Sequence, residues 1–276
     1  MISFQGQPGA YSDLACRTAY PGTATLPCQT FEAAIEAVRN GVADLAMLAC
    51  ENSIAGRVPD LHALLPGSGL FIVAEHFQPV AHCLLGVPGA TVADIQRIHS
   101  HSVALGQVRH IVRELGAQAV VEVDTAGSAE LVARWGRKEE AAVASELAAE
   151  IYGLQVLRRH VEDMENNTTR FYVMAREPHH PENGRGMDGV GRLMTTFIFH
   201  VRNVPAALYK VMGGFATNGV NMTKLESYMT GGRFTATQFL CDIEGGQDEV
   251  PVQRAFEEAR FFTDNFLVLG SYPARR

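Results

Sequence analysis

Hydrophobic positions divide the chain into short apolar runs and longer segments with helical spacing. Thr30 is a favourable N-cap residue, and the apolar positions after it recur with helical spacing, which predicts a helix over residues 31–40. The apolar run at residues 42–48 is typical of a buried strand. The same reasoning predicts strands at residues 70–74, 81–87, 95–100 and 171–175, and helices at 14–19, 102–115, 128–135 and 145–152. Strands alternating with helices indicate an α/β fold with a largely parallel sheet.

A second pattern begins after residues 176–192, which are rich in Gly and Pro and almost free of apolar residues, as in a linker. Strand and helix patterns then follow in the order βαββαβ, the ferredoxin-like arrangement. Gly231-Gly232, between the two central strands, is typical of a hairpin turn. The elements expected are a strand at 193–201, a helix at 205–218, strands at 221–229 and 234–243, a helix at 250–262 and a strand at 266–270.

Length and composition are those of a globular protein. The 276 residues favour two domains, and 47% hydrophobic with 19% charged residues excludes a disordered chain or a coiled coil. No apolar run reaches the roughly 18 residues of a membrane span, and the N-terminus lacks the basic start of a signal peptide. We therefore expect a cytoplasmic protein that does not contact membranes.

Charge and cysteine usage exclude further classes. The net charge is −7 and no block of Lys and Arg occurs, so we expect no nucleic-acid partner, although a small anion could still bind locally. The five cysteines include no Cys-x-x-Cys pair, which argues against a zinc knuckle and a disulfide framework. Reduced, mostly buried thiols are expected.

Three polar clusters follow predicted strands, where α/β sheets place ligands, and a fourth lies just before the strand predicted at residues 171–175. The turn at residues 6–12 could direct backbone N–H groups at an anion, or be an ordinary βα turn. Glu51-Asn52-Ser53 offers donors and acceptors together, or caps the next segment. In His99-Ser100-His101-Ser102 no third ligand lies at metal-binding spacing, so one of the serines is expected to cap the next helix while His101 faces a cleft. Residues 166–171 place Arg170 beside two threonines, as a carboxylate clamp or an exposed turn.

Composition and pattern alone leave a hydrolase-like enzyme and a ligand-binding sensor open. Several short motifs, however, stand in the order and spacing of one family. They are Gly9-Ala10-Tyr11-Ser12, Glu51-Asn52-Ser53, Ser100-His101, Tyr152-Gly153-Leu154 and Asn167-Thr168-Thr169-Arg170-Phe171. Together they resemble the signatures of prephenate dehydratases, except that Ser102 stands where proline is usual. Residues 221–227 resemble part of the ACT regulatory domain of the same enzymes.

The resemblance implies a catalytic domain like a type II periplasmic binding protein, with two α/β lobes that the chain connects twice, near residues 75–82 and 161–167. The domains it implies are a catalytic domain at 1–177 (lobe 1 about 1–76 and 165–177, lobe 2 about 77–164), a linker at 178–192 and a ferredoxin-like ACT domain at 193–276. ACT domains commonly pair between subunits, so a homodimer or homotetramer is expected.

The implied reaction is the decarboxylative dehydration of prephenate to phenylpyruvate in L-phenylalanine biosynthesis, without a cofactor or a metal. The resemblance makes Thr169 the catalytic residue, as a donor to the departing hydroxyl. Substrate binding is assigned to Tyr11, Ser12, Glu51, Asn52, Ser53, Ser100, His101, Arg170 and Phe171. The alternatives are arogenate dehydratase, with the same chemistry on the aminated substrate, and a non-catalytic amino-acid sensor.

L-Phenylalanine is the expected effector of the C-terminal domain. Its binding is assigned to Ala207, Leu208, Asn221, Glu226 and Ser227. The chain departs from the phenylalanine-sensing members, since Ala206 replaces a glycine and Tyr228-Met229 replaces Arg-Pro. Feedback regulation is therefore expected at a site that differs from theirs.

Overall fold

A computed structural model describes residues 1–179, 192–229 and 236–275. By their internal contacts the residues group into two compact units. The first unit comprises Met1–His62 and His76–Phe171, and the second comprises Ala63–Glu75 and Tyr172–Arg276. This grouping differs from the domain bounds expected from the sequence, which stay a prediction. Most of the expected linker at 178–192 lies outside the described residues.

The first lobe is built on a sheet with the strand order β2-β1-β3-β11-β5, in which the short β4 pairs with β3. Strand β1 runs parallel to both β2 and β3, and helices α1 and α2 pack against these strands. Thr30 caps α2, as predicted, by accepting a hydrogen bond from the backbone of Ala33. The elements are β1 (Ile2–Gln5), α1 (Tyr11–Ala19), β2 (Thr25–Cys28), α2 (Phe31–Arg39), β3 (Leu45–Asn52), β4 (Gly56–Arg57), α3 (Pro59–Leu64), β5 (Phe71–Pro79) and β11 (Thr168–Ala175).

The second lobe has a sheet of mixed direction with the order β10-β6-β9-β7-β8. Strand β7 is parallel to β8 and β9, but β6 is antiparallel to β9 and β10. The expectation of a largely parallel sheet is therefore wrong for this lobe. Its elements are β6 (Cys83–Gly86), β7 (Arg97–His101), α4 (Ser102–Gly106), α5 (Arg109–Glu114), β8 (Gln118–Glu122), α6 (Thr125–Trp135), β9 (Glu140–Ala144), α7 (Glu146–Tyr152) and β10 (Gln155–Arg158).

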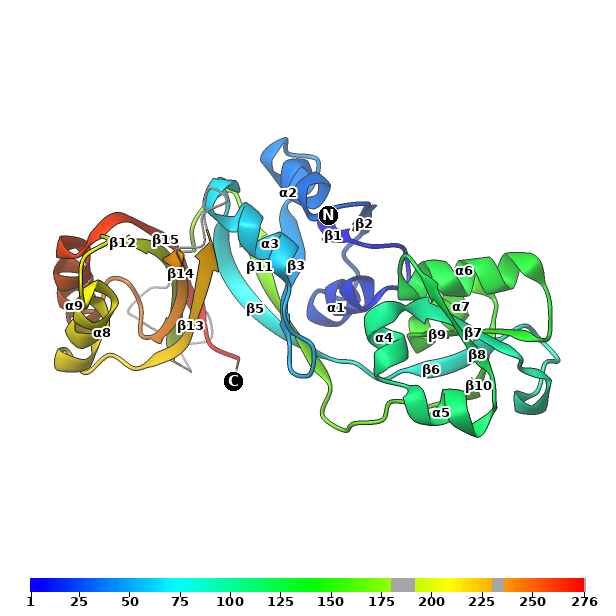
Figure 1. The fold of residues 1–276 in the computed structure, drawn as a ribbon. Coiled ribbons are helices and arrows are strands. Elements are labelled where there is room, and N and C mark those ends of the chain that lie inside the picture. The colour runs from blue at the N-terminus through cyan, green and yellow to red at the C-terminus, as the bar shows by residue number, and fades with distance from the viewer. Residues whose placement is uncertain (180–191, 230–235, 276) are drawn as a thin grey trace. The chain divides into compact units, whose positions relative to one another are not determined.

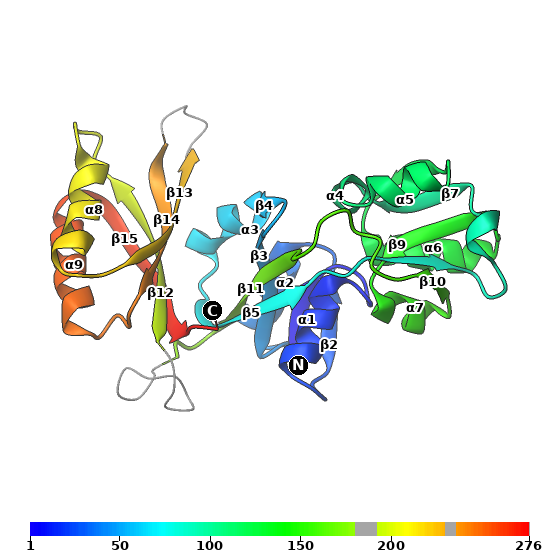
Figure 2. The same cartoon turned by 90° about the horizontal axis from the view of Figure 1, so that it is seen from below.

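Two connecting segments, residues 80–82 and 159–167, join the lobes and run side by side (Figures 1 and 2). The backbone N–H of Val80 donates to the carbonyl of Asn167 at 2.8 Å, and that of Val161 donates to the carbonyl of His82 at 3.0 Å. Backbone hydrogen bonds thus hold together the segment that leaves the first lobe and the segment that returns to it just before Thr169. We call these two linked segments the junction of the lobes. The four residues that these two hydrogen bonds join lie in the stretches 75–82 and 161–167, where the resemblance implied the connections.

Two predicted elements differ in position. Strand β3 begins at Leu45 rather than residue 42, because the backbone N–H groups of Val42 and Ala43 bond to the carbonyl of Ala37 and close the end of α2. The helix predicted at 102–115 is split into α4 and α5. The Asp163 carboxylate accepts hydrogen bonds from the first two N–H groups of α5, which begins a new helix there.

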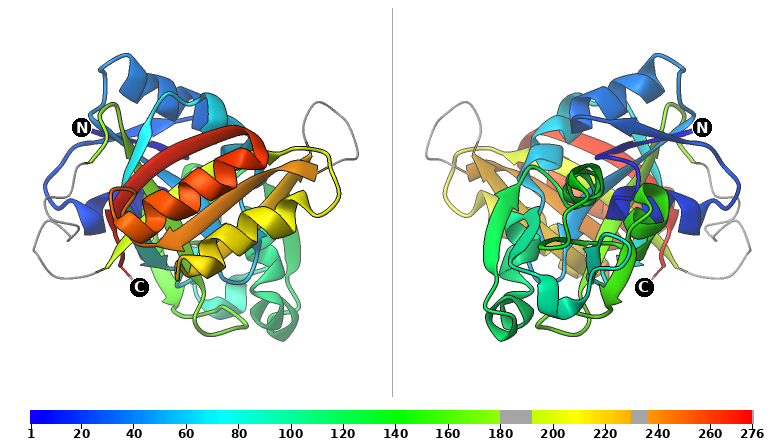
Figure 3. Two further views of the ribbon diagram at one scale, coloured as in Figure 1. Left: turned by 90° about the vertical axis from the view of Figure 1, so that its left-hand side faces the viewer. Right: turned by 90° about the vertical axis from the view of Figure 1, so that its right-hand side faces the viewer.

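The C-terminal part has the predicted βαββαβ order and a sheet ordered β13-β14-β12-β15, with α8 and α9 on one face (Figure 3). Its core contains stacked and edge-to-face rings, among them Phe197, Phe215, Phe256 and Phe266. The predicted Gly231-Gly232 turn lies outside the described residues. The elements are β12 (Leu193–Val201), α8 (Ala207–Thr217), β13 (Met222–Met229), β14 (Ala236–Glu244), α9 (Val250–Phe261) and β15 (Thr263–Pro273). Of the helices in the described ranges, none is both long and apolar enough to span a membrane.

Candidate active site

Asn52, at the end of β3, is held in one orientation by the backbone that follows it. Its Oδ1 accepts hydrogen bonds from the N–H groups of Ile54 at 3.0 Å and Ala55 at 2.8 Å. An amide side chain has one accepting and one donating end. Since two N–H groups occupy the accepting end, the Nδ2 group must point the other way, toward β11.

Thr169 lies on β11, the neighbour of β3 in the sheet, and its side chain is half-buried. Asn52 Nδ2 donates to Thr169 Oγ1 at 3.0 Å and to Asn167 Oδ1 at 2.7 Å. The Thr169 oxygen therefore accepts from Asn52, which leaves its own hydroxyl proton to be donated elsewhere. This arrangement suits a residue that donates to a leaving group.

Glu51 and Arg170 form an ion pair directly beside this contact. Arg170 is only 2% exposed, its Nη1 donates to Glu51 Oε1 at 2.8 Å, and its guanidinium carbon lies 5.9 Å from the centre of the Phe77 ring. Phe171 is buried in the lobe as well. The structure thus buries both Arg170 and Phe171, and their predicted part in substrate binding stays a prediction.

Ser53 fastens the end of β3 to the start of β11. Its hydroxyl donates to the carbonyl of Asn166 at 3.0 Å and accepts from the N–H of Thr168 at 2.9 Å. Its own backbone N–H donates to the carbonyl of Thr168 at 2.8 Å. These contacts hold the threonine segment in register with Asn52.

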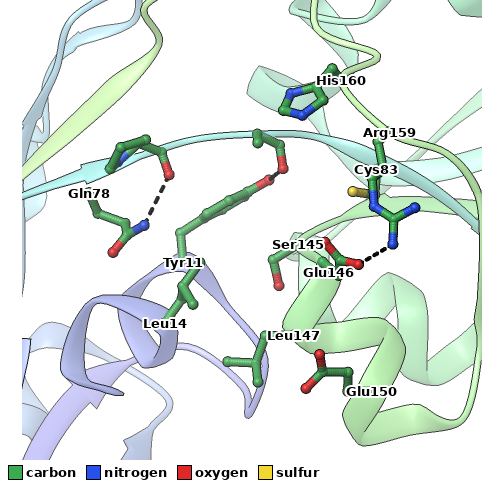
Figure 4. A pocket seen from close by; sticks show the side chains of 12 residues that line it. Tyr11, Leu14, Gln78, Cys83, Ser145, Glu146, Leu147, Glu150, Arg159 and His160 are labelled. Carbon is green, nitrogen blue, oxygen red and sulfur yellow. Dashed lines mark hydrogen bonds and ion pairs between the residues drawn. The ribbon is translucent and has the colours of Figure 1, made fainter. Parts of the chain in front are cut away.

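Tyr11 points from α1 to the connecting segments (Figure 4). Its hydroxyl lies 2.8 Å from the carbonyl oxygen of Ala81 and 2.9 Å from Nδ1 of His82. Burial raises the pKa of this hydroxyl well above its ordinary value, so it stays protonated. The half-buried Ser12 follows it in the first turn of α1. A cavity of about 440 Å³ beside Tyr11 is also lined by Cys83 and by residues of α7.

The loop before α1 contacts the second lobe. Ser145 Oγ donates to the carbonyl of Gly9 at 2.5 Å, and the Tyr152 hydroxyl donates to that of Pro8 at 2.9 Å. Gly9 has a φ of +86°, and a Cβ atom there would lie 2.8 Å from the Cα of Ala148. The Gly-x-Tyr-Ser and Tyr-Gly-Leu motifs therefore meet where the two lobes touch.

His101 caps α4, since its Nδ1 accepts from the N–H of Val103 at 3.3 Å. The prediction of a serine cap is wrong here, because Ser100 is fully buried and donates to the carbonyl of Val143 at 2.6 Å. His99 points elsewhere, with ring nitrogens 2.8 Å from Glu140 and 3.0 Å from Glu122. The two histidines of this cluster therefore have different roles: His99 contacts two carboxylates and His101 caps a helix.

Two polar residues that the sequence reasoning missed join this site. Gln107 Oε1 lies 2.9 Å from both Asn167 Nδ2 and His82 Nε2, and Gln107 also lines a cavity of about 230 Å³ with Ile54 and Gly106. His82 is the one polar residue in the stretch 80–85, and a buried polar group of this kind requires a partner. The sequence therefore contains a signal for His82, whereas nothing in the sequence pattern distinguishes Gln107 from other polar residues.

The predicted effector residues lie in two places of the C-terminal part. Ala207 and Leu208 begin α8, while Asn221 precedes β13, the edge strand that carries Glu226 and Ser227. Glu226 lies within 3.3 Å of Lys224 Nζ and accepts from the Tyr228 hydroxyl at 3.4 Å. Tyr228, one of the departures from the phenylalanine-sensing motif, thus contacts a predicted effector residue.

Comparison with known proteins gives a consistent picture. The family model for prephenate dehydratase matches residues 2–179, which hold every residue of the site around Thr169. The chain belongs to the prephenate dehydratase family. As prephenate dehydratases are carbon–oxygen lyases, the chain is an enzyme of that class.

Three relatives of this prephenate dehydratase chain illustrate the range of the family. A protein of Komagataeibacter europaeus named bifunctional N-acyl-homoserine lactone acylase/prephenate dehydratase is 62% identical over 99% of this chain and 96% of its own length. The arogenate dehydratase/prephenate dehydratase 1 of Arabidopsis thaliana is 36% identical over 99% and 71%. The crystal structure of prephenate dehydratase from Arthrobacter aurescens in complex with L-Phe is 30% identical over 99% and 90%, with a TM-score of 0.86.

Proposed function

We propose that this chain converts prephenate to phenylpyruvate, CO₂ and water in L-phenylalanine biosynthesis, with Thr169 as the catalytic donor. The observation that carries the proposal is the contact between Asn52 Nδ2 and Thr169 Oγ1, which leaves the threonine proton free to be donated. The 62% identical relative and the Arabidopsis relative both carry prephenate dehydratase in their names.

The reaction needs a donor of this kind. When the ring carboxylate leaves as CO₂, the electron pair of its C–C bond enters the ring, and the C–O bond at the opposite carbon breaks to release hydroxide. Negative charge develops on the departing oxygen, and an oriented hydroxyl donor stabilises it. Threonine is a weak acid, so its contribution is a fixed hydrogen bond in the transition state rather than an easy proton transfer.

The test is turnover of prephenate by the wild type and by Thr169→Ala, followed through the absorbance of the phenylpyruvate enolate in base. We expect wild-type turnover and a reduction in kcat of about 10²–10⁴-fold in the variant, the range of a positioned proton donor. Circular dichroism and urea unfolding check that the variant is folded. Absence of wild-type turnover would overturn the reaction, and an unchanged kcat in a folded Thr169→Ala would overturn the role of Thr169.

The finer substrate choice is between prephenate and arogenate, which differ by a keto and an amino group. The name of the bacterial relative with 62% identity includes prephenate dehydratase and does not mention arogenate, and we propose prephenate rather than arogenate as the preferred substrate. The ratio of kcat/KM on the two substrates tests this. A higher value on arogenate would reverse the assignment.

We propose N-acyl-homoserine lactone acylase activity as a second candidate function. The relative that carries this name is matched over 96% of its length, so its acylase activity does not require a separate domain that this chain lacks. Release of homoserine lactone from an acylated substrate, followed by mass spectrometry, tests it. No release above the heat-treated protein would remove this candidate.

We further propose that L-phenylalanine regulates the enzyme through an ACT-type C-terminal domain, in a homodimer or homotetramer. The Arthrobacter relative, at 30% identity, was solved in complex with L-Phe. The proposed contacts are Ala207, Leu208, Asn221, Glu226 and Ser227. Calorimetric titration with L-phenylalanine, and its effect on prephenate turnover, test the proposal, and absence of binding heat would contradict it.

A further inference from the structure

A chain of hydrogen bonds leads from Thr169 to the junction of the lobes. In each of these bonds, the donor and the acceptor follow from the bond before it. Two backbone N–H groups fix the Asn52 amide, so its Nδ2 donates to Asn167 Oδ1 at 2.7 Å. With its oxygen accepting there, the other end of the Asn167 amide donates. Asn167 Nδ2 lies 2.9 Å from Gln107 Oε1, which therefore accepts.

The same oxygen of Gln107 determines which nitrogen of His82 carries the proton. Gln107 Oε1 lies 2.9 Å from His82 Nε2, and an amide oxygen can only accept. His82 must therefore donate from Nε2. In a neutral imidazole the other nitrogen is then an acceptor, and Nδ1 faces the Tyr11 hydroxyl at 2.9 Å.

His82 is well placed to hold this chain in position. Its side chain is buried, and burial lowers its pKa, which keeps the ring neutral near pH 7. Its backbone N–H donates to Glu162 Oε2 at 2.8 Å and its carbonyl accepts from Val161 at 3.0 Å, so the other connecting segment holds its backbone on both sides. The Tyr11 ring packs against the imidazole edge-to-face at 5.5 Å.

We infer that His82 is a positioning residue for the reaction, which acts on Thr169 from the junction of the lobes through Gln107, Asn167 and Asn52. The inference rests on the proposed function of Thr169 and extends it to a residue that does not contact it. Each amide in the chain has one donor end and one acceptor end. Without the Nε2 donor, Gln107 Oε1 keeps only its hydrogen bond from Asn167 Nδ2. Gln107 can then shift together with Asn167, and the positions of Asn52 Nδ2 and Thr169 Oγ1, rather than the orientation of the Asn52 amide, are less tightly held.

Two substitutions separate this role from a merely structural one. In His82→Gln the side-chain amide nitrogen can occupy the place of Nε2 and still donate to Gln107. In His82→Asn the shorter amide reaches only the place of Nδ1, so Gln107 has no donor from residue 82. Both variants remove the buried ring, and urea unfolding measures that shared structural cost.

We expect His82→Asn to lower kcat about 10- to 100-fold while KM stays nearly unchanged, because misplacement of a catalytic group lowers the rate rather than binding. We expect His82→Gln to recover most of this reduction in kcat. His99→Gln is the matched control, since His99 is as buried as His82 but lies on β7 of the second lobe and bonds to Glu122 and Glu140. The kcat of this control should stay at the wild-type value. Equal reductions of kcat in His82→Asn and His82→Gln, or none in either, would overturn the inference.

A spectroscopic readout keeps the inference testable even if prephenate is not the substrate. NMR of the full chain labelled with ¹⁵N-histidine distinguishes the two neutral tautomers of His82, with His82→Gln identifying its signals. The inference predicts a proton on Nε2 near pH 7, and a proton on Nδ1 would overturn it. Failure of the wild type to convert prephenate would instead overturn the proposed function.

Discussion

Asn52→Asp is the most informative single change in the site, because it replaces one donor group by an oxygen and leaves the shape almost unchanged. The oxygen that accepts from Ile54 and Ala55 is kept. The new oxygen, however, faces Asn167 Oδ1 and Thr169 Oγ1, to which Asn52 donates at 2.7 and 3.0 Å. The Thr169 hydroxyl would then turn its proton toward the carboxylate and away from the substrate.

The magnitude follows from the two hydrogen bonds to side chains, those to Asn167 and Thr169, that the substitution removes. Two side-chain acceptors lose the donor that Asn52 supplies, and each group left unsatisfied costs about 1–3 kcal/mol, so we expect the free energy of unfolding to fall by about 2–6 kcal/mol. Without an oriented donor in the transition state, kcat should fall by about 10²–10³-fold, as it does when one oxyanion donor is removed. KM should change much less than kcat.

The assay is prephenate turnover by the enolate absorbance of phenylpyruvate, with urea unfolding of the same preparations. Asn40→Asp is the control, since it makes the same chemical change at an exposed position at the end of α2. A kcat of Asn52→Asp within twofold of the wild type would refute the reasoning that Asn52 orients Thr169.

Three further predictions concern stability. Gly9→Ala should destabilise the chain by about 3 kcal/mol, because its backbone has a positive φ and the new Cβ would clash with Ala148. Gly22→Ala should cost only about 1 kcal/mol, because its φ of +79° is similar but no atom lies near the new Cβ. Equal costs of the two variants in urea unfolding would contradict the clash at Gly9. Arg170→Met should cost about 3 kcal/mol by removing the buried guanidinium that pairs with Glu51, whereas Arg158→Met, in an exposed pair, should cost less than about 1 kcal/mol. A small cost in both variants would contradict the importance of the buried pair. Burial lowers the pKa of His82, so as the pH falls below the ordinary value of 6.5 this residue takes up a proton in the unfolded chain but not in the folded chain. The free energy of unfolding should therefore fall below pH 6.5. His82→Gln should make this fall smaller, and the same pH profile of stability in the wild type and the variant would contradict the prediction.

Patterns of apolar residues predicted most of the elements, since burial of one helix face or one strand leaves a clear period. Strand β12 has the predicted bounds, and helix α2 ends within one residue of them. Strands β2, β4, β8, β9 and β10 and helix α3 were missed. Strand β2 contains a proline, and β9 begins with Glu140, whose charge is compensated by Arg97 from a neighbouring strand. This charge compensation comes from a residue distant in the sequence, so it leaves no periodic pattern of apolar residues from which the strand could be predicted.

The residues of the site could be selected from the sequence, but not their contacts. Asn52 and Thr169 lie 117 positions apart and meet only because β3 and β11 are neighbours in the sheet. For the same reason the burial of Arg170 against Glu51 could not be predicted from a turn sequence. The part played by Gln107 depends on the break between α4 and α5, which Asp163 causes from a distant segment.

The central claim is that the Thr169 hydroxyl donates to the departing oxygen, and one comparison tests it most directly. Thr169→Ser keeps the hydroxyl, and Thr169→Val keeps the shape without it. We predict that Thr169→Ser retains a substantial part of the wild-type kcat on prephenate, while the kcat of Thr169→Val falls about 10²-fold or more at similar stability. A folded Thr169→Val with wild-type kcat would contradict the account.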